Sequence, residues 1–143
     1  MKRIQVIYWS QSGNTKEMAD AIGEGIQEAG AQAEVIDVSA ASVELLTQQE
    51  VFAIGCPAMG AEVLEESEME PFITELEKVV AGKKIALFGS YSWGDGQWMR
   101  EWVERMSDAG AIMINEEGTM AQDTPDSDAL GRCRQLGAQL AAL

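Results

Sequence analysis

Apolar and polar positions alternate along this chain with two different periods, which predict strands and helices in turn. Five short apolar runs are typical of buried strands, because they are continuous and bounded by turn residues. They cover residues 4–8, 33–38, 51–55, 84–89 and 111–115, with a possible resumption of the last at 118–121.

Helical periodicity separates these runs. It is clearest over residues 15–28, where Met18, Ile22 and Ile26 recur every four positions ahead of Gly30. Further helices are predicted at 43–48, from Glu70-Pro71 to about residue 80, at 97–109, and from Pro125 to the C-terminus. Five strands alternating with helices indicate an α/β fold with a parallel sheet that is covered on both faces, in one domain over residues 1–143.

Ligands of open parallel sheets bind beyond the carboxyl ends of the strands, at the switch point of strand order. We therefore expect the chemistry in the segments that follow the first, third and fourth strands, residues 9–14, 56–70 and 90–96. All three are rich in small, hydroxyl-bearing or aromatic residues.

The first of these segments suits a phosphate group. Hydroxyls and an amide lie between a strand and a helix start, where backbone N–H groups and the helix dipole favour an anion. Its residues are Ser10, Gln11, Ser12, Gly13, Asn14 and Thr15. The segment lacks Lys and Arg and matches neither the GxxxxGK[ST] nor the GxGxxG motif. A plain helix start capped by Ser12 or Asn14 is the alternative.

The other two segments suit a flat ring. Trp93 lies among glycines in the third segment and offers a stacking face, while Met59 in the second offers a soft apolar cover. Trp98 and Trp102, four residues apart on a helix, are expected in the core. Cys56 is no phosphatase nucleophile, because that chemistry needs an Arg where Glu62 stands. A phosphate site and two ring-covering segments fit flavin mononucleotide (FMN).

Composition narrows the function. The 143 residues contain no histidine, which excludes the usual general base and serine-hydrolase triads, and they predict no metal site. The net charge of −14 disfavours nucleic acid and anionic membranes and favours partners with basic faces. The two cysteines lack the spacing of a disulfide framework, and the N-terminus lacks a signal-peptide pattern, so we expect a cytoplasmic protein.

These motifs together resemble short-chain flavodoxins of the anaerobic clostridial type, over essentially the whole chain. The matching segments are Tyr8-Trp9-Ser10, Gly13-Asn14-Thr15, Gly55 to Gly60, Glu62 to Ser67, Glu70-Pro71-Phe72, Gly82-Lys83-Lys84, Phe88 to Tyr91, Trp93 to Gly96 and Trp98-Met99. The resemblance implies a three-layer sandwich with strand order 2-1-3-4-5. It also implies a low-potential one-electron carrier, not an enzyme, in which FMN shuttles between semiquinone and hydroquinone.

The resemblance assigns roles to residues of this chain. Residues Ser10 to Thr15 would bind the phosphate. Met59 and Trp93 would pack on the two faces of the flavin ring, and Glu62 would form a hydrogen bond with the ring N3. The full set expected to bind FMN is Ser10, Gln11, Ser12, Gly13, Asn14, Thr15, Pro57, Ala58, Met59, Gly60, Ala61, Glu62, Ser90, Tyr91, Ser92, Trp93 and Gly94. Basic flavin or iron–sulfur oxidoreductases would dock on a monomer, near acids at 62, 65, 66, 68 and 70.

Two departures from the family pattern stand out. Gln11 replaces a usual Gly, and Ala61 follows the turn glycine where Asp, Asn, Ser or Gly is usual. A type II turn over residues 59–62 would require positive φ at Ala61, at a cost of about 1 kcal/mol, and would weaken semiquinone stabilisation. Competing functions are an FMN-dependent quinone or nitro reductase, a flavin-storage or interaction domain, and a signalling receiver domain. A receiver requires a pair of acidic residues after its first strand, and this chain has Tyr8-Trp9-Ser10 there.

Overall fold

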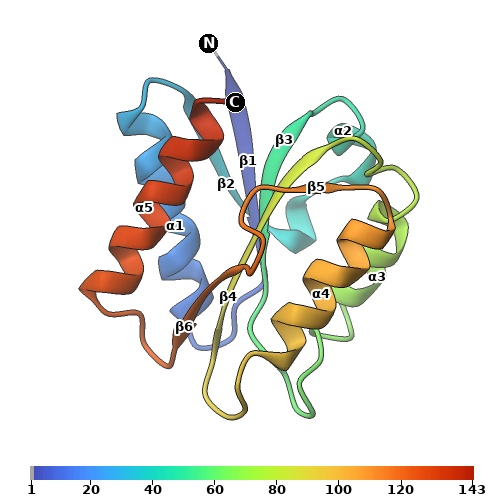
Figure 1. The fold of residues 1–143 in the computed structure, drawn as a ribbon, viewed down its shortest axis with the longest axis vertical. Coiled ribbons are helices and arrows are strands. Elements are labelled where there is room, and N and C mark those ends of the chain that lie inside the picture. The colour runs from blue at the N-terminus through green and yellow to red at the C-terminus, as the bar shows by residue number, and fades with distance from the viewer. Residues whose placement is uncertain (1) are drawn as a thin grey trace.

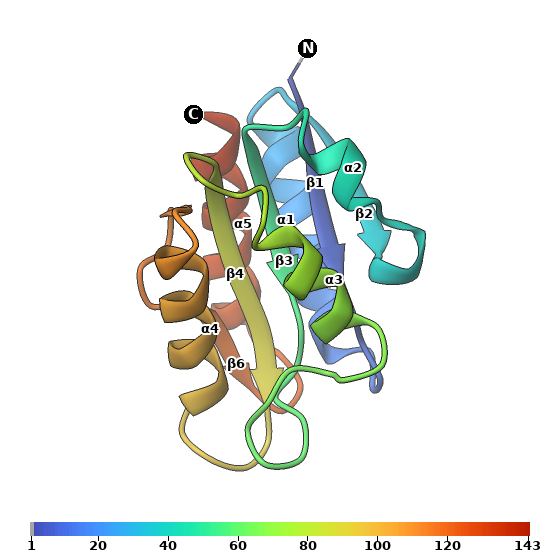
Figure 2. The same cartoon turned by 90° about the vertical axis from the view of Figure 1, so that its right-hand side faces the viewer.

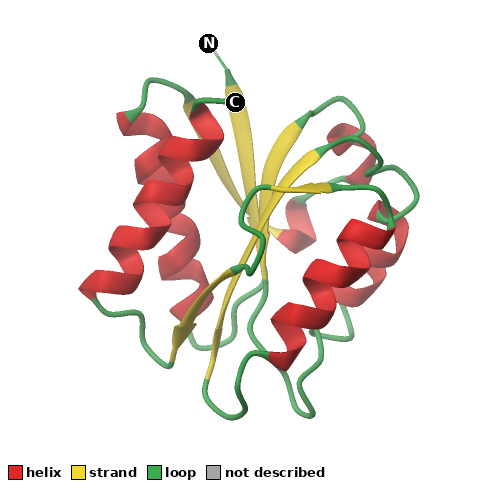
Figure 3. Ribbon diagram, viewed as in Figure 1, coloured by secondary structure: helices red, strands yellow, loops and turns green. Residues whose placement is uncertain are grey.

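Parallel strands form the centre of the molecule, and helices cover both faces of the sheet (Figures 1 and 3). The computed structural model describes residues 2–143. The strands are β1 (Arg3–Tyr8), β2 (Gln32–Asp37), β3 (Val51–Gly55), β4 (Lys84–Tyr91), β5 (Ile112–Met113) and β6 (Thr119–Gln122). The helices are α1 (Asn14–Glu28), α2 (Val43–Leu46), α3 (Met69–Leu76), α4 (Gln97–Asp108) and α5 (Ser127–Ala141).

The strand order is β2-β1-β3-β4-β5, and β6 pairs with β4 farther along the same edge. All the pairings within this sheet are parallel. This confirms the predicted α/β class and the order 2-1-3-4-5. The order reverses between β1 and β3, so the carboxyl ends of these neighbours diverge into loops on opposite faces and leave room for a ligand.

The last predicted strand is interrupted between β5 and β6, because the Asn115 side chain replaces the backbone as the hydrogen-bond partner of β4 there. The Asn115 amide accepts the N–H of Leu87 at 3.1 Å and donates to the carbonyl of Leu87 at 2.7 Å. It also donates to the Thr119 hydroxyl at 3.0 Å. Ile114 N–H still bonds the carbonyl of Ile85 at 2.9 Å, the backbone of residues 115–118 then leaves β4, and the chain rejoins β4 as β6, as the predicted resumption anticipates.

Two separate cores lie on the two faces of the sheet. Helices α1 and α5 pack on one face around Ile22, Ile26 and Leu136, while α2, α3 and α4 cover the other around Phe52, Trp98 and Trp102. Figure 2 looks onto this second face, with α3 in front of the strands and α4 beside β4. Trp98 and Trp102 are only 2% and 1% exposed, which confirms their predicted place in the core.

Several predicted helix ends are wrong by a few residues. Helix α3 stops at Leu76 instead of residue 80, because Val79 N–H bonds the carbonyl of Leu76 at 2.9 Å, which tightens the chain into turns. Helix α5 begins at Ser127 instead of Pro125, since the Asp126 side chain caps it by accepting the N–H of Ala129 at 2.8 Å.

Within residues 2–143, none of the helices combines the length and the apolar character that crossing a lipid bilayer requires. Both chain ends lie at the upper edge in Figure 1, and the loops that follow β1, β3 and β4 gather at the lower edge. The candidate site therefore lies at the lower edge, where the carboxyl ends of the strands and their loops come together.

Candidate functional site

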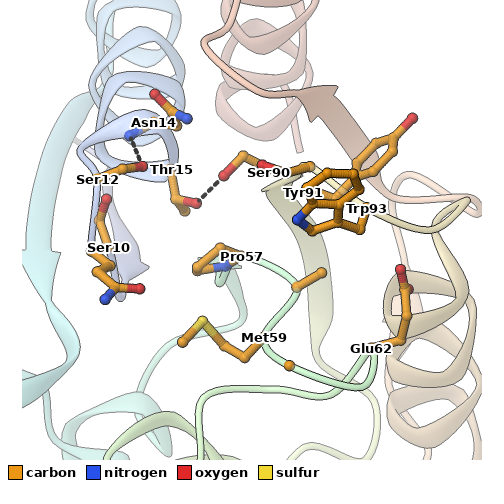
Figure 4. A pocket seen from close by; sticks show the side chains of 14 residues that line it. Ser10, Ser12, Asn14, Thr15, Pro57, Met59, Glu62, Ser90, Tyr91 and Trp93 are labelled. Atoms are coloured by element: carbon orange, nitrogen blue, oxygen red, sulfur yellow. Dashed lines mark hydrogen bonds between the residues drawn. The ribbon is translucent and has the colours of Figure 1, made fainter.

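A cleft of about 320 Å³ opens at the carboxyl ends of β1, β3 and β4, a size typical of small-molecule sites. Figure 4 shows its lining side chains, which come from all three expected loops. They are Ser10, Gln11, Ser12, Asn14, Thr15, Pro57, Ala58, Met59, Gly60, Glu62, Ser90, Tyr91, Ser92 and Trp93. Every lining residue belongs to the predicted set, and three predicted residues, Gly13, Ala61 and Gly94, do not line the cleft.

The polar end of the cleft lies at the start of α1. Gly13 occupies the N-cap position with φ 96° and has no side chain that could cap the helix. Ser12 Oγ accepts the N–H of Asn14 and Ser10 Oγ that of Lys16, both at a long 3.4 Å. The alternative that Ser12 or Asn14 is the N-cap residue is therefore wrong. Ser10 Oγ accepts the N–H of Gly13 at 3.1 Å, which folds the loop back onto itself. Helix N–H groups without a capping side chain are donors for an anion.

Two buried hydroxyls join this end to the central strand. Thr15 and Ser90 are 1% and 5% exposed, and their oxygens lie 2.9 Å apart (Figure 4). Ser90 and Tyr91 belong to β4, which extends two residues beyond its predicted end. The strand, not a loop, therefore positions these two side chains, and the loop of the third segment starts at Ser92.

The apolar end of the cleft is bordered by aromatic and sulfur-containing side chains. Trp93 is 88% exposed at the tip of its loop, and Tyr91 lies beside it in Figure 4. Met59 is half-buried and reaches the cleft from the second loop. An exposed indole next to a concave surface costs solvation unless a ligand covers it, so this end suits a flat ring.

The turn that carries Met59 differs from the expected one. Met59 and Val63 form an isolated antiparallel bridge with N–H···O distances of 2.9 and 3.0 Å, which closes a three-residue turn. Positive φ occurs at Gly60 (45°) and Glu62 (61°), and among the described non-glycine residues only Glu62 and Asp123 have it. The expected strain at Ala61 is therefore wrong for this conformation, and the left-handed backbone lies one residue later.

Glu62 connects the two ring-covering loops. Its Oε2 accepts the N–H of Trp98 at 2.9 Å, in the first turn of α4. Its Oε1 is buried and has no hydrogen-bond partner within residues 2–143. A buried carboxylate oxygen without a donor costs free energy, so the site suits a ligand that brings an N–H group to this point. The N3–H of a flavin ring has that chemistry.

Gly94 belongs to the predicted FMN-binding set but does not line the cleft; it lies against Glu62, which does. A Cβ atom at this position would overlap with Glu62 Oε1, and φ is +82°. Any side chain there would displace the carboxylate, so Gly94 acts through Glu62. The sequence gives no sign of this contact, because Glu62 and Gly94 are 32 positions apart and meet only in the folded protein.

Cys56 lies beneath the cleft and is not a nucleophile. The side chain is fully buried, and burial raises the pKa of its thiol to about 12. Its backbone instead holds the site together: the carbonyl of Cys56 accepts the indole N–H of Trp98 at 3.1 Å, and its N–H bonds the carbonyl of Phe88 at 3.1 Å. This agrees with the exclusion of phosphatase chemistry from the sequence.

Sequence reasoning missed residues that fix the loops without lining the cleft. Glu65 is buried and caps α3, and Arg105 forms a two-point ion pair with Glu70 that joins α4 to α3. Neither contact has a recognised sequence signal: Glu65 and Ser67 do not match a capping box, and nothing in the sequence indicates the pairing of positions 70 and 105. The acidic stretch near the site is therefore partly buried and partly paired.

Comparisons with known proteins agree with this architecture. A family model described as "Flavodoxin" matches residues 6–137. The chain is 45% identical over 138 residues to a flavodoxin of Clostridium beijerinckii, covering 96% of this chain and 99% of that protein. It is 40% identical over 134 residues to a flavodoxin of Megasphaera elsdenii, covering 94% and 95%.

Solved structures show the same relationship. The solution structure of two-electron reduced Megasphaera elsdenii flavodoxin superposes with a TM-score of 0.87 at 40% identity, covering 98% of this chain and 99% of that one. A flavodoxin from the domain Archaea also superposes with a TM-score of 0.87, at 30% identity. The chain thus belongs to the flavodoxin family, whose members bind FMN and transfer electrons.

Proposed function

We propose that the cleft binds FMN non-covalently and that the protein is a low-potential one-electron carrier between redox proteins. The observation that carries this proposal is the single cleft that joins a phosphate-type loop, two buried hydroxyls, an exposed indole and a carboxylate oxygen without a donor. When bound, FMN supplies the one-electron chemistry. The protein supplies binding, orientation and exclusion of water.

The phosphate end would rely on neutral donors. The segment from Ser10 to Thr15 has no cationic side chain, and the adjacent Lys16 ammonium pairs with Asp20 at 2.9 Å. We propose that hydroxyls, the Asn14 amide and the N–H groups at the start of α1 hold the phosphate. Its negative charge then stays largely uncompensated, which disfavours placing further negative charge in the cleft.

The ring end would orient and shield the isoalloxazine. Met59 and Trp93, which both line the cleft, would cover its faces, and Glu62 Oε1, which has no other partner in the described part of the chain, would accept the ring N–H. Apolar cover removes water from the ring and raises the cost of adding negative charge to it. Together with the net charge of −14, this supports a low potential for the second electron.

A carrier of this kind works with partner proteins. We propose that flavin- or iron–sulfur-containing oxidoreductases with basic faces dock near the exposed Trp93, that the protein is monomeric, and that it acts in the cytoplasm. The support is its acidity, since an acidic surface attracts basic partners and accelerates their association. The reductase alternative is not favoured, because two relatives that this chain matches over 99% and 95% of their own length are named flavodoxins.

Stepwise reduction tests the proposal. The purified protein is expected to show the visible spectrum of a flavin, to release FMN on denaturation, and to take up its electrons in two separate one-electron stages. Addition of NADPH alone should leave the flavin oxidised. A colourless protein that does not bind FMN refutes the binding proposal, and rapid bleaching by NADPH refutes the carrier proposal in favour of a reductase.

A further inference from the structure

The acidic stretch of residues 62–70 holds the second loop by hydrogen bonds as well as carrying charge. Glu62 accepts the N–H of Trp98 at 2.9 Å, and Glu68 accepts the indole N–H of Trp9 at 3.3 Å. The first contact reaches α4, and the second reaches the phosphate-type loop. These two carboxylates therefore connect the second loop to both of its neighbours.

The remaining glutamates of this stretch differ sharply from one another. Glu70 is paired with Arg105 at 2.6 and 2.9 Å, and this ion pair lowers the pKa of the Glu70 carboxyl. Glu66 is exposed and makes no side-chain hydrogen bond or ion pair within residues 2–143. Glu65, its neighbour, points inward and is only 7% exposed. Adjacent positions thus carry one free charge and one buried charge.

The Glu65 carboxylate is surrounded by donors from the start of α3. Its Oε2 accepts the N–H of Ser67 at 2.8 Å and also the Ser67 hydroxyl. Its Oε1 accepts the N–H groups of Glu68 at 2.7 Å and Met69 at 3.0 Å. Four donors and the positive end of the α3 dipole compensate the buried charge.

The backbone of Glu65 closes the second loop. Its N–H lies 3.5 Å from Cys56 Sγ, at the end of β3, and its carbonyl accepts the N–H of Glu70 at 2.8 Å. Residues 57–64 leave the sheet at Cys56 and return to the same cysteine at Glu65. They form a closed loop whose ends touch, and this loop carries Met59 and Glu62 into the cleft.

We propose that Glu65 is a positioning residue of the FMN site, whose buried carboxylate anchors the returning end of the loop of residues 57–64 to helix α3. It touches neither the cleft nor the ligand and acts through the position of Met59 and Glu62. The inference rests on the proposed FMN function. Without the anchor, three N–H groups at the start of α3 lose their acceptor, and the loop is free to move from the cleft.

Glu65→Gln and Glu66→Gln form a matched pair of tests, because each removes one negative charge at neighbouring positions. We expect Glu65→Gln to weaken FMN binding to the apoprotein at least about tenfold, and Glu66→Gln to change it by less than about twofold. Flavin fluorescence titration measures both dissociation constants. A purely electrostatic role predicts equal effects of the two substitutions, and equal effects would overturn the proposal.

Amide hydrogen exchange of the apoprotein gives a second measurement that needs no flavin. Glu65→Gln should accelerate exchange at residues 57–64, whereas Glu66→Gln should leave it unchanged. Ser67→Ala removes one donor while keeping the charge, and we expect a smaller acceleration in the same segment. If Glu65→Gln does not fold, unchanged exchange in Ser67→Ala overturns the proposal.

The two measurements separate the possible failures. A wild-type apoprotein that does not bind FMN refutes the proposed function, while the exchange experiment still tests the anchor. A wild-type protein that binds FMN, together with variants that bind and exchange alike, refutes only the role of Glu65.

Discussion

The hydroxyl oxygens of Thr15 and Ser90 lie 2.9 Å apart, 75 positions apart in the sequence, and join helix α1 to strand β4 at the cleft. Both side chains are buried, so each hydroxyl depends on the other for a partner. This contact aligns the phosphate-type loop with the strand that leads to the ring end. It links the first turn of α1 directly to the carboxyl end of β4.

We predict that Thr15 and Ser90 are energetically coupled. Thr15→Val and Ser90→Ala should each lower the unfolding free energy of the apoprotein by about 1–3 kcal/mol, because each leaves a buried hydroxyl without its partner. The double variant should lose less than the sum of the single losses. Urea unfolding at equilibrium measures the cycle, and strictly additive losses would show that the hydrogen bond contributes nothing.

Replacing Trp93 and replacing Trp98 should affect different properties: the first should weaken FMN binding, and the second should lower stability. Trp93 is 88% exposed, so Trp93→Ala should change the unfolding free energy of the apoprotein by no more than about 0.5 kcal/mol. It should nevertheless weaken FMN binding about tenfold, through lost stacking and cover. Trp98→Ala removes a buried ring and should cost about 3–5 kcal/mol.

Thermal unfolding and FMN titration of both variants test this contrast. A Trp93→Ala protein that binds FMN like the wild type would contradict the assignment of its indole to the ring.

A matched pair of glycines tests the space around Glu62. Gly94 and Gly82 have nearly equal φ, +82° and +81°, but a Cβ at Gly94 would meet Glu62 Oε1, whereas one at Gly82 has nothing within 4 Å. Both alanine substitutions should cost about 1 kcal/mol of stability from the left-handed backbone. Only Gly94→Ala should also weaken FMN binding severalfold, because it moves the carboxylate.

Isothermal titration of the two variants with FMN decides this point. Equal affinities in Gly94→Ala and Gly82→Ala would mean that the Glu62 carboxylate is not needed where the structure places it.

The buried Glu65 carboxylate predicts an acid-sensitive step in stability. Burial by itself raises the pKa of this group, but hydrogen bonds from the Ser67 hydroxyl and three N–H groups outweigh it and lower the pKa to about 2, from 4.5. Because the folded pKa is the lower one, its contribution is complete above about pH 4.5. It falls as the pH approaches 2, by about 3 kcal/mol in total.

Unfolding free energies of the apoprotein between pH 6 and pH 2 measure this step, with Glu65→Gln as the control. The control should show a flatter decline over the same range. Parallel curves for the two proteins would contradict the capping role of the carboxylate.

Association with a basic redox partner should slow as salt is added. An acidic surface raises the encounter rate at low ionic strength, and screening shortens its range from about 30 Å at 0.01 M to about 8 Å at 0.15 M salt. Stopped-flow electron transfer at increasing NaCl measures the rate. A rate independent of salt would place docking away from the acidic surface.

The sequence predicted those parts of this protein that depend on local pattern. Apolar runs and helical periods identified the strands, the helices and the parallel sheet, and the segments at the carboxyl ends of β1, β3 and β4 supplied every residue that lines the cleft. Element ends were less certain, because side-chain caps such as Asp126 and substitutes such as Asn115 decide them. The turn at Ala61 was misjudged for the same reason, since a cross-turn bridge to Val63 sets its length.

The sequence by itself determined which residue types line the cleft at the carboxyl ends of the strands, because topology brings those ends together in any parallel sheet of this order. Only the tertiary structure decided what each glutamate does. Charge and spacing are alike for Glu65 and Glu66, yet one is buried among four donors and the other lies in water. Burial and partners, not residue type, set the role of a charged side chain.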